Sequence, residues 1–254
     1  MNRLLFFFLI GFSALVFSNC SDDGGTDIDS SSTPFFPLET GHWVEYKLDS
    51  VIYDDFDNSV TNTERYLRIE VGEQVNDGVG GTLTELFLFE KVNPTDNYSL
   101  EKVWFAKVDN GVLETVEDNL RFIKLDLPPT TGKSWEGNQF IFPDNGDNPN
   151  NSTDFYEGWD YFYEEVGSPF EINGLSFNNT VLVNEVDEFG IVTTHRIGYT
   201  RYAENVGVVR KHWEMVIENC GTPGCSEKEL PVIDRSIGRK GFFVDWYLID
   251  YKRD

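Results

Sequence analysis

Two of the three cysteines, Cys220 and Cys225, lie close together and bracket the sequence Gly-Thr-Pro-Gly. Thiols at this spacing can form a disulfide, bind a metal ion or act as a redox pair. A metal site needs further ligands, and a redox pair typically has two intervening residues. In an oxidising compartment outside the cytosol, neighbouring thiols of this kind form a disulfide. For an exported chain, the sequence therefore predicts a Cys220–Cys225 disulfide that closes a short loop.

The other residue types that commonly carry catalysis lack their motifs. The three histidines, His42, His195 and His212, are too far apart for a local zinc motif. Gly132-Lys133-Ser134 resembles the end of a phosphate-binding loop, but Leu127 stands where that loop needs its first glycine. The nucleophile motif G-x-S-x-G does not occur. We therefore predict no catalytic residue, no metal site and no cofactor.

An aromatic series offers a candidate binding surface. Trp159, Tyr161 and Tyr163 follow each other at every second position. In a β-strand these side chains share one face, together with the acidic Glu157 and Glu165. Such a face suits a sugar or an apolar ligand, but large aromatic side chains also fill protein cores. Both interpretations remain open at the level of the sequence.

The N-terminus has the pattern of a secretory signal. Arg3 precedes an apolar run from Leu4 to Phe17, which as a helix is about 21 Å long. Because a bilayer core is about 30 Å thick, a signal peptide fits this run better than a membrane-spanning helix. Cys20 follows directly after Ser18 and Asn19. The segment resembles the lipobox of bacterial lipoproteins in the looser form of the Bacteroidetes.

This resemblance implies that residues 1–19 are removed and that Cys20 carries lipid such as palmitate. Ser21, Asp22 and Asp23 resemble the acidic export tag that directs Bacteroidetes lipoproteins to the cell surface. The resemblance to this tag implies an outer-membrane location, with the domain on the cell surface or, as the alternative, on the periplasmic face. Asp49-Ser50-Val51 resembles a short Bacteroidetes O-glycosylation motif, with Ser50 as the acceptor.

The charge balance excludes one class of partner. The chain has 44 acidic and 20 basic side chains, for a formal net charge of −24. Nucleic-acid binding needs clustered Lys and Arg, so no nucleic-acid partner is expected. Attraction to anionic lipid is disfavoured too, which leaves lipid on Cys20 as the link to a membrane. Residues 20–34 are polar except for Ile28 and predict a flexible tether, about 20 Å from end to end.

From Phe35 onward the sequence predicts one all-β domain, residues 35–254. Arg65–Val71 alternates apolar and polar residues, as a half-buried strand does. The final run, Phe242–Tyr251, is apolar on both faces and predicts a strand inside a sheet. Short turns and the absence of a long amphipathic helix favour curved antiparallel sheets forming a barrel, half-barrel or sandwich. Further strands are predicted at Trp43–Tyr53, Thr82–Val92, Leu100–Val108, Leu120–Leu127, Asp154–Val166, Ser176–Val186, Ile191–Tyr202 and Val206–Ile217.

Two segments carry a resemblance of their own. FPLETGHWVEY, residues 36–46, opens the domain, and YAENVGVV, residues 202–209, comes near its end. Together they resemble secreted proteins and lipoproteins of bacteria whose function is unknown. The resemblance implies a curved antiparallel sheet and supplies no catalytic residues.

The sequence favours a non-enzymatic lipoprotein that binds a glycan, an apolar ligand or an envelope protein, or forms part of an envelope assembly. The alternative is a hydrolase, for example one acting on glycans, with acidic residues in a β concavity. A deep pocket with two carboxylates about 5–10 Å apart would favour the hydrolase. A filled interior would favour a binding or structural role.

Overall fold

The computed structural model describes residues 33–54, 56–57, 59–142, 154–191, 194–217 and 240–253. Within these residues the chain forms strands joined by short turns, and one short 3₁₀ helix, η1. The strands are β1 (Trp43–Asp54), β2 (Ser59–Asn76), β3 (Thr82–Lys91), β4 (Ser99–Asp109), β5 (Val112–Glu117), β6 (Leu120–Asp126), β7 (Ser134–Trp135), β8 (Tyr161–Ile172), β9 (Leu175–Ile191), β10 (Thr194–Ala203), β11 (Gly207–Ile217) and β12 (Lys240–Tyr251), and η1 covers Asp154–Tyr156.

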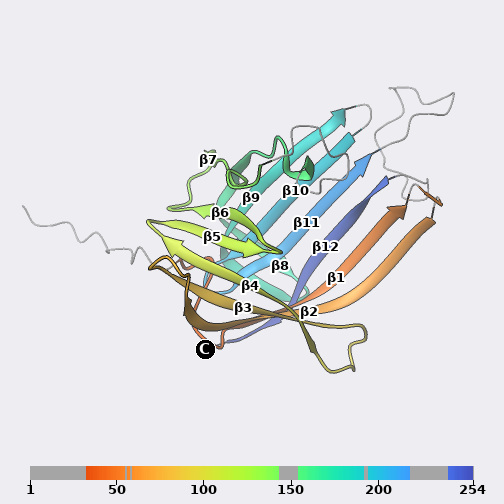
Figure 1. Cartoon of the computed structure of the whole chain (residues 1–254). Helices are drawn as coiled ribbons and strands as arrows, with labels where there is room; N and C mark the ends of the chain where they lie inside the picture. The colour runs from red at the N-terminus through yellow and green to blue at the C-terminus, as the bar shows by residue number, and fades with distance from the viewer. Residues whose placement is uncertain are drawn as a thin grey trace, which may run out of the picture.

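All twelve of these strands belong to one sheet, with the order β6-β5-β4-β3-β2-β1-β12-β11-β10-β9-β8-β7. Every neighbouring pair is antiparallel. The first strand pairs with the last, so the edges of the sheet are β6 and β7. The sheet curls until these edges approach each other (Figure 1). The predicted all-β class is confirmed, and among the predicted architectures the fold is a nearly closed barrel.

The seam between the two edges is closed by isolated hydrogen bonds. The Ile123 amide of β6 donates to the Gly137 carbonyl at 2.8 Å. The Trp135 indole of β7 donates to the Ile123 carbonyl at 3.0 Å. The Tyr163 hydroxyl of β8 accepts from the Asp126 amide at 3.1 Å and lies 3.2 Å from the Asp126 carbonyl. These contacts satisfy backbone groups that a sheet edge otherwise leaves open.

Side chains fill the interior of the barrel from wall to wall. On β9, alternation directs Val181 and Val183 inward, and neither side chain is exposed. At the end of the barrel where the described chain starts, Phe35 is buried in the core. In η1, the Phe155 ring lies 5.6 Å from Phe242 and 5.3 Å from Trp159. Aromatic side chains from two segments outside the sheet thus complete the core.

The predicted strands correspond closely to the observed ones. Each of the ten predicted runs overlaps a strand among β1 to β4, β6 and β8 to β12; Ile191–Tyr202 also includes the last residue of β9, and Asp154–Val166 begins in η1 and becomes strand only at Tyr161. The prediction missed β5 because its inward positions include Thr115 and Glu117, so the strand lacks an apolar face. It also missed β7, which has two residues. The last strand lies between β1 and β11, as its apolar faces predicted.

Thr33 and Pro34, at the end of the predicted tether, contact the barrel. The Thr33 side chain is 4% exposed, and the Pro34 carbonyl accepts a hydrogen bond from the Asn205 amide.

In the part of the chain that the structure describes, no helix is long and apolar enough to cross a membrane.

The seam gives a testable prediction. Replacing Tyr163 with Phe removes the hydroxyl that bonds to the Asp126 backbone. The Asp126 amide then loses this partner, whereas the Asp126 carbonyl keeps its bond from the Lys133 ammonium at 2.9 Å, so the free energy of unfolding should fall by about 1–2 kcal/mol. Urea denaturation measures this change. Tyr66→Phe, which removes an exposed hydroxyl bonded to Glu64, should change it by less than about 0.5 kcal/mol. Equal effects of the two variants would contradict the role of Tyr163 in the seam.

Candidate functional site

The two segments that resemble other bacterial proteins contact each other directly. The His42 Nε2 atom lies 3.0 Å from the Val206 carbonyl, although 164 residues separate the two in sequence. The Asn205 amide donates to the Pro34 carbonyl at 2.6 Å. The opening segment is therefore fixed on the turn between β10 and β11. Sequence spacing alone could not reveal this contact.

The β10–β11 turn has the backbone conformation that this contact requires. Asn205 and Gly207 adopt left-handed backbone angles, with φ of 61° and 101°. Asparagine tolerates such a conformation and glycine adopts it freely. The Val206 amide donates to the Ala203 carbonyl at 3.2 Å, which closes the turn. The turn therefore presents the Val206 carbonyl to His42.

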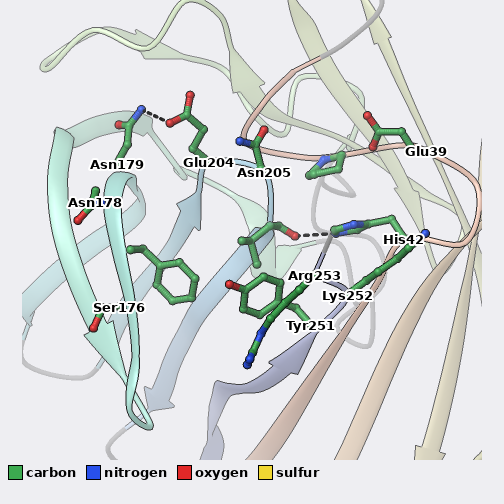
Figure 2. A pocket seen from close by; sticks show the side chains of 13 residues that line it. Glu39, His42, Ser176, Asn178, Asn179, Glu204, Asn205, Tyr251, Lys252 and Arg253 are labelled. Carbon is green, nitrogen blue, oxygen red and sulfur yellow. Dashed lines mark hydrogen bonds between the residues drawn. The ribbon is translucent and has the colours of Figure 1, made fainter.

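A pocket of about 570 Å³ opens beside this contact; we call it the end pocket. Four segments meet there: the opening segment, the start of β9, the β10–β11 turn and the C-terminal end of β12 (Figure 2). Its volume is in the range typical of small-molecule sites. The lining residues are Pro37, Glu39, His42, Ser176, Phe177, Asn178, Asn179, Glu204, Asn205, Val206, Tyr251, Lys252 and Arg253.

The end pocket is lined by both hydrogen-bond donors and hydrogen-bond acceptors. The side-chain amide of Asn179 donates to the Glu204 carboxylate at 3.0 Å, which holds that carboxylate at one side of the pocket (Figure 2). Lys252 and Arg253 contribute positive charge from the end of β12. Asn178 is exposed and has an amide free to contact a ligand. Amides, carboxylates and a tyrosine ring together suit a ligand with many hydroxyl groups.

Inside the barrel, a second cluster carries charge. Lys124 of β6 forms an ion pair with Glu117 at 3.2 Å. Thr115 donates to the same carboxylate at 2.8 Å. Burial raises the pKa of Glu117, but the positive charges of Lys124 and Lys211 outweigh it, so this pKa is lower than usual. Glu117 is therefore ionised at neutral pH and is paired with the Lys124 ammonium.

Glu185 of β9 is the most deeply buried acid of this cluster, with 1% of its surface exposed. The Thr200 hydroxyl donates to one carboxylate oxygen at 2.6 Å. The Trp213 indole donates to the other at 2.6 Å. Both oxygens of Glu185 are therefore already bonded.

Two β-bulges lie at these charged residues. On β6, Leu125 pairs with Leu113 and Ile123 pairs with Glu114, so Lys124 is an extra residue. On β9, Glu185 is the extra residue between Asn184 and Val186. A bulge lets two consecutive residues turn to the same side, and Lys124 and Leu125 are both buried, as are Glu185 and Val186. Neither charged residue was expected inside, because charged side chains are rarely buried unless they are paired.

The interior gives little support to the alternative of a glycan hydrolase. Its two acids, Glu117 and Glu185, are engaged by lysine, threonine and tryptophan side chains. The cavity beside Glu117 is about 40 Å³, whereas ligand pockets are typically several hundred Å³. A sugar ring does not fit this space while the surrounding side chains keep their positions.

The aromatic series lies in the core. Trp159 is 7% exposed, and Tyr161 and Tyr163 are fully buried. The Trp135 ring lies 6.0 Å from Tyr161 and 4.8 Å from Tyr163. The interpretation of these three residues as a ligand-facing surface is therefore corrected: they pack inward, because the seam and η1 cover them.

Of the other residues singled out in the sequence, Ser50 lies on β1 and is half-buried. Its hydroxyl is hydrogen-bonded to Thr63 on β2. Both residues line a second open pocket of about 330 Å³. No group of metal-ligating side chains occurs among the described residues. The residues that lie outside the described part of the chain are Cys20, Ser21, Asp22, Asp23, Cys220 and Cys225.

A histidine on the outer face of the barrel is surrounded by charge. His212 Nδ1 lies 2.7 Å from Asp245, and Nε2 lies 3.6 Å from Glu214. Arg210 also bonds to Asp245, and the Tyr199 ring lies 5.1 Å from the imidazole ring. Burial lowers the pKa of His212, but its bonds to Asp245 and Glu214 raise the pKa above its usual 6.5. The arrangement stabilises a charged imidazolium.

Comparisons with known proteins add one structural likeness. No protein-family model and no curated protein matches the chain. The chain is similar to a solved structure from Bacteroides fragilis NCTC 9343, described as a presumed exported protein with a YmcC-like fold. The identity is 13%, the match covers 86% of this chain and 99% of that chain, and the TM-score is 0.36. A likeness at this level assigns neither a family nor a function.

The His212 cluster predicts a pH-dependent stability. Because folding raises the pKa of His212 above 6.5, the charged ring stabilises the fold fully below that pH, and this contribution is lost as pH rises through the raised pKa. His212→Gln should lower the free energy of unfolding by about 1–2 kcal/mol at pH 6 and by less at pH 9. Urea denaturation at both values measures the difference. Asp245→Asn should remove most of the pH dependence, and a His212→Gln effect that does not change with pH would contradict the assignment.

Proposed function

We propose that this chain is a lipid-anchored, non-enzymatic lipoprotein of the bacterial envelope that binds a glycan in the end pocket. One observation carries the proposal of a binding role: the barrel interior is filled, while a pocket of about 570 Å³ with hydrogen-bonding walls lies open at its end. The four converging segments supply amide, carboxylate and hydroxyl groups, which match the hydroxyl groups of a sugar.

The sequence supports the anchored part of the proposal. An apolar run too short to span a bilayer ends just before Cys20, and acidic residues follow it. Two acyl chains on one cysteine give stable membrane attachment, whereas a chain of net charge −24 gains nothing from anionic lipid. We place the domain on the outer membrane, facing the cell surface.

The position of the end pocket is compatible with this anchor. Pro37, Glu39 and His42 line the pocket and lie a few residues after the proposed tether. A flexible tether of this length spans about 20 Å on average. The end pocket would therefore lie near the membrane surface, within reach of envelope glycans.

The anchor is tested by changing Cys20. Cys20→Ala should move the protein from the membrane fraction to the soluble fraction, because it removes the only cysteine at the lipobox position. Fractionation of expressing cells and immunoblotting measure the distribution. The double variant Cys220→Ala, Cys225→Ala is the matched control and should stay with the membranes. Sedimentation of Cys20→Ala with membranes would refute lipid anchoring at this residue.

The end pocket is tested with Asn178→Ala. Protein carrying Cys20→Ala is purified in soluble form and applied to an array of neutral and acidic bacterial oligosaccharides. Removing the exposed Asn178 amide should weaken binding about 3- to 10-fold, as expected for one or two neutral hydrogen bonds. Asn97→Ala removes an exposed amide outside the end pocket and should leave the affinity unchanged.

Two outcomes contradict a glycan site in the end pocket. One is that no oligosaccharide binds. The other is that Asn178→Ala and Asn97→Ala weaken binding equally, which would place the contact elsewhere.

A further inference from the structure

Lys211 of β11 is a buried cation that no carboxylate of the described residues contacts directly. It is 9% exposed, and within the described part of the chain its ammonium group makes no ion pair or hydrogen bond. Its contacts are the Trp213 and Trp246 rings, whose centroids lie 3.9 Å and 5.0 Å from Nζ. A buried charge is costly unless it is paired. The site therefore lacks an acceptor for Lys211.

The neighbouring charges do not supply this acceptor. Glu117 is held by Lys124 and Thr115, and Glu185 is held by Thr200 and Trp213. Burial lowers the pKa of Lys211, and the positive charge of Lys124 lowers it further, against the opposing effect of Glu117 and Glu185. An additional acceptor beside the two lysines would stabilise the charged form of Lys211.

A cavity of about 40 Å³ lies beside Lys211 and Lys124. The rest of its wall includes Glu117, Thr115 and Thr200 near the lysines, and apolar side chains such as Ile69 and Leu86. A second cavity of about 40 Å³ shares Ile69 and Leu86 with the first and continues along apolar side chains. The two cavities therefore form a path that is polar at the lysines and apolar beyond them.

The apolar path leads to the end pocket. The second cavity is lined by Pro37, His42 and Val206, and the same three residues line the end pocket. The Phe36 side chain borders both interior cavities, as Ile69, Leu86 and Val208 also do. Phe36 belongs to the short segment before β1, so its ring can leave without breaking a strand. Its departure would join the cavities into one channel.

We propose that this channel is a binding site for an aliphatic carboxylate, whose head group bonds to Lys211 and Lys124 and whose chain replaces the Phe36 ring. The two lysines select a carboxylate because a charge-assisted hydrogen bond satisfies the buried ammonium group. The apolar walls select an unbranched hydrocarbon chain, which gains free energy by leaving water. The end pocket is the route by which the ligand enters.

This site is distinct from the proposed glycan site, and the test separates them. Full-length protein carrying Cys20→Ala is titrated calorimetrically with sodium decanoate and with decanol, which has the same chain length without the charge. Decanoate should bind at least about tenfold more tightly than decanol, as expected for one charge-assisted bond. Asn97→Ala, at an exposed residue outside the end pocket, should leave decanoate binding unchanged.

Three variants locate the ligand. Lys211→Met should weaken decanoate binding about tenfold or more and leave decanol binding unchanged. Phe36→Ala should strengthen binding of both, because it opens the channel. Lys47→Met, which removes a lysine paired with Glu64 on the outer face, should have no effect. If Lys211→Met does not fold, Lys211→Gln, which keeps hydrogen-bond donors but loses the charge, replaces it and should likewise weaken decanoate binding more than decanol binding.

The proposal is overturned if decanoate binds neither the parent protein nor Phe36→Ala. It is also overturned if Lys211→Met, or Lys211→Gln in its place, keeps the preference for decanoate over decanol. Water alone would then fill the cavity beside Lys211.

Discussion

The edges of the twelve-stranded sheet, β6 and β7, meet at a seam where the backbone ladder stops. A sheet edge exposes amide and carbonyl groups that must find partners. Here the Tyr163 hydroxyl is hydrogen-bonded to the Asp126 backbone. The Ile123 backbone is hydrogen-bonded to the Trp135 indole and to the Gly137 carbonyl. The seam brings these aromatic side chains to the inner side of the wall. Closure of the barrel and filling of its core are thus two results of the same contacts.

Much of the fold was predictable because alternation of apolar and polar residues reports directly on a half-buried sheet. The apolar faces of the last strand indicated a position inside the sheet, and β12 lies between β1 and β11. β5 was missed because Thr115 and Glu117 stand at its inward positions. Whether the sheet formed a barrel or a sandwich depended on the seam, whose partners are distant in sequence and carry no local pattern.

The sites were less predictable for the same reason. Resemblance identified the opening segment and the segment around Val206, but only the fold shows that His42 joins them and that a pocket opens beside them. Lys124 and Glu185 lie at bulges inside the barrel, whereas charged side chains in strands are normally expected on the solvent face. For Tyr161 the sequence allowed two interpretations, a core residue or part of a binding face. The structure shows that its side chain is completely buried, which favours the core.

A filled barrel leaves two places where a ligand can act: an outer surface, or an inner space that a mobile side chain vacates. The end pocket is the first kind, since four segments shape it without any change in the core. The space beside Lys211 is the second kind, because Phe36, which borders both its cavity and the next, belongs to a segment outside the sheet. An apolar residue at position 211 would fill the core without burying a lysine that makes no direct ion pair with a described residue. The lysine therefore supports the proposed ligand site, and Phe36, which would have to move, belongs to the segment that leads from the proposed tether and lipid anchor.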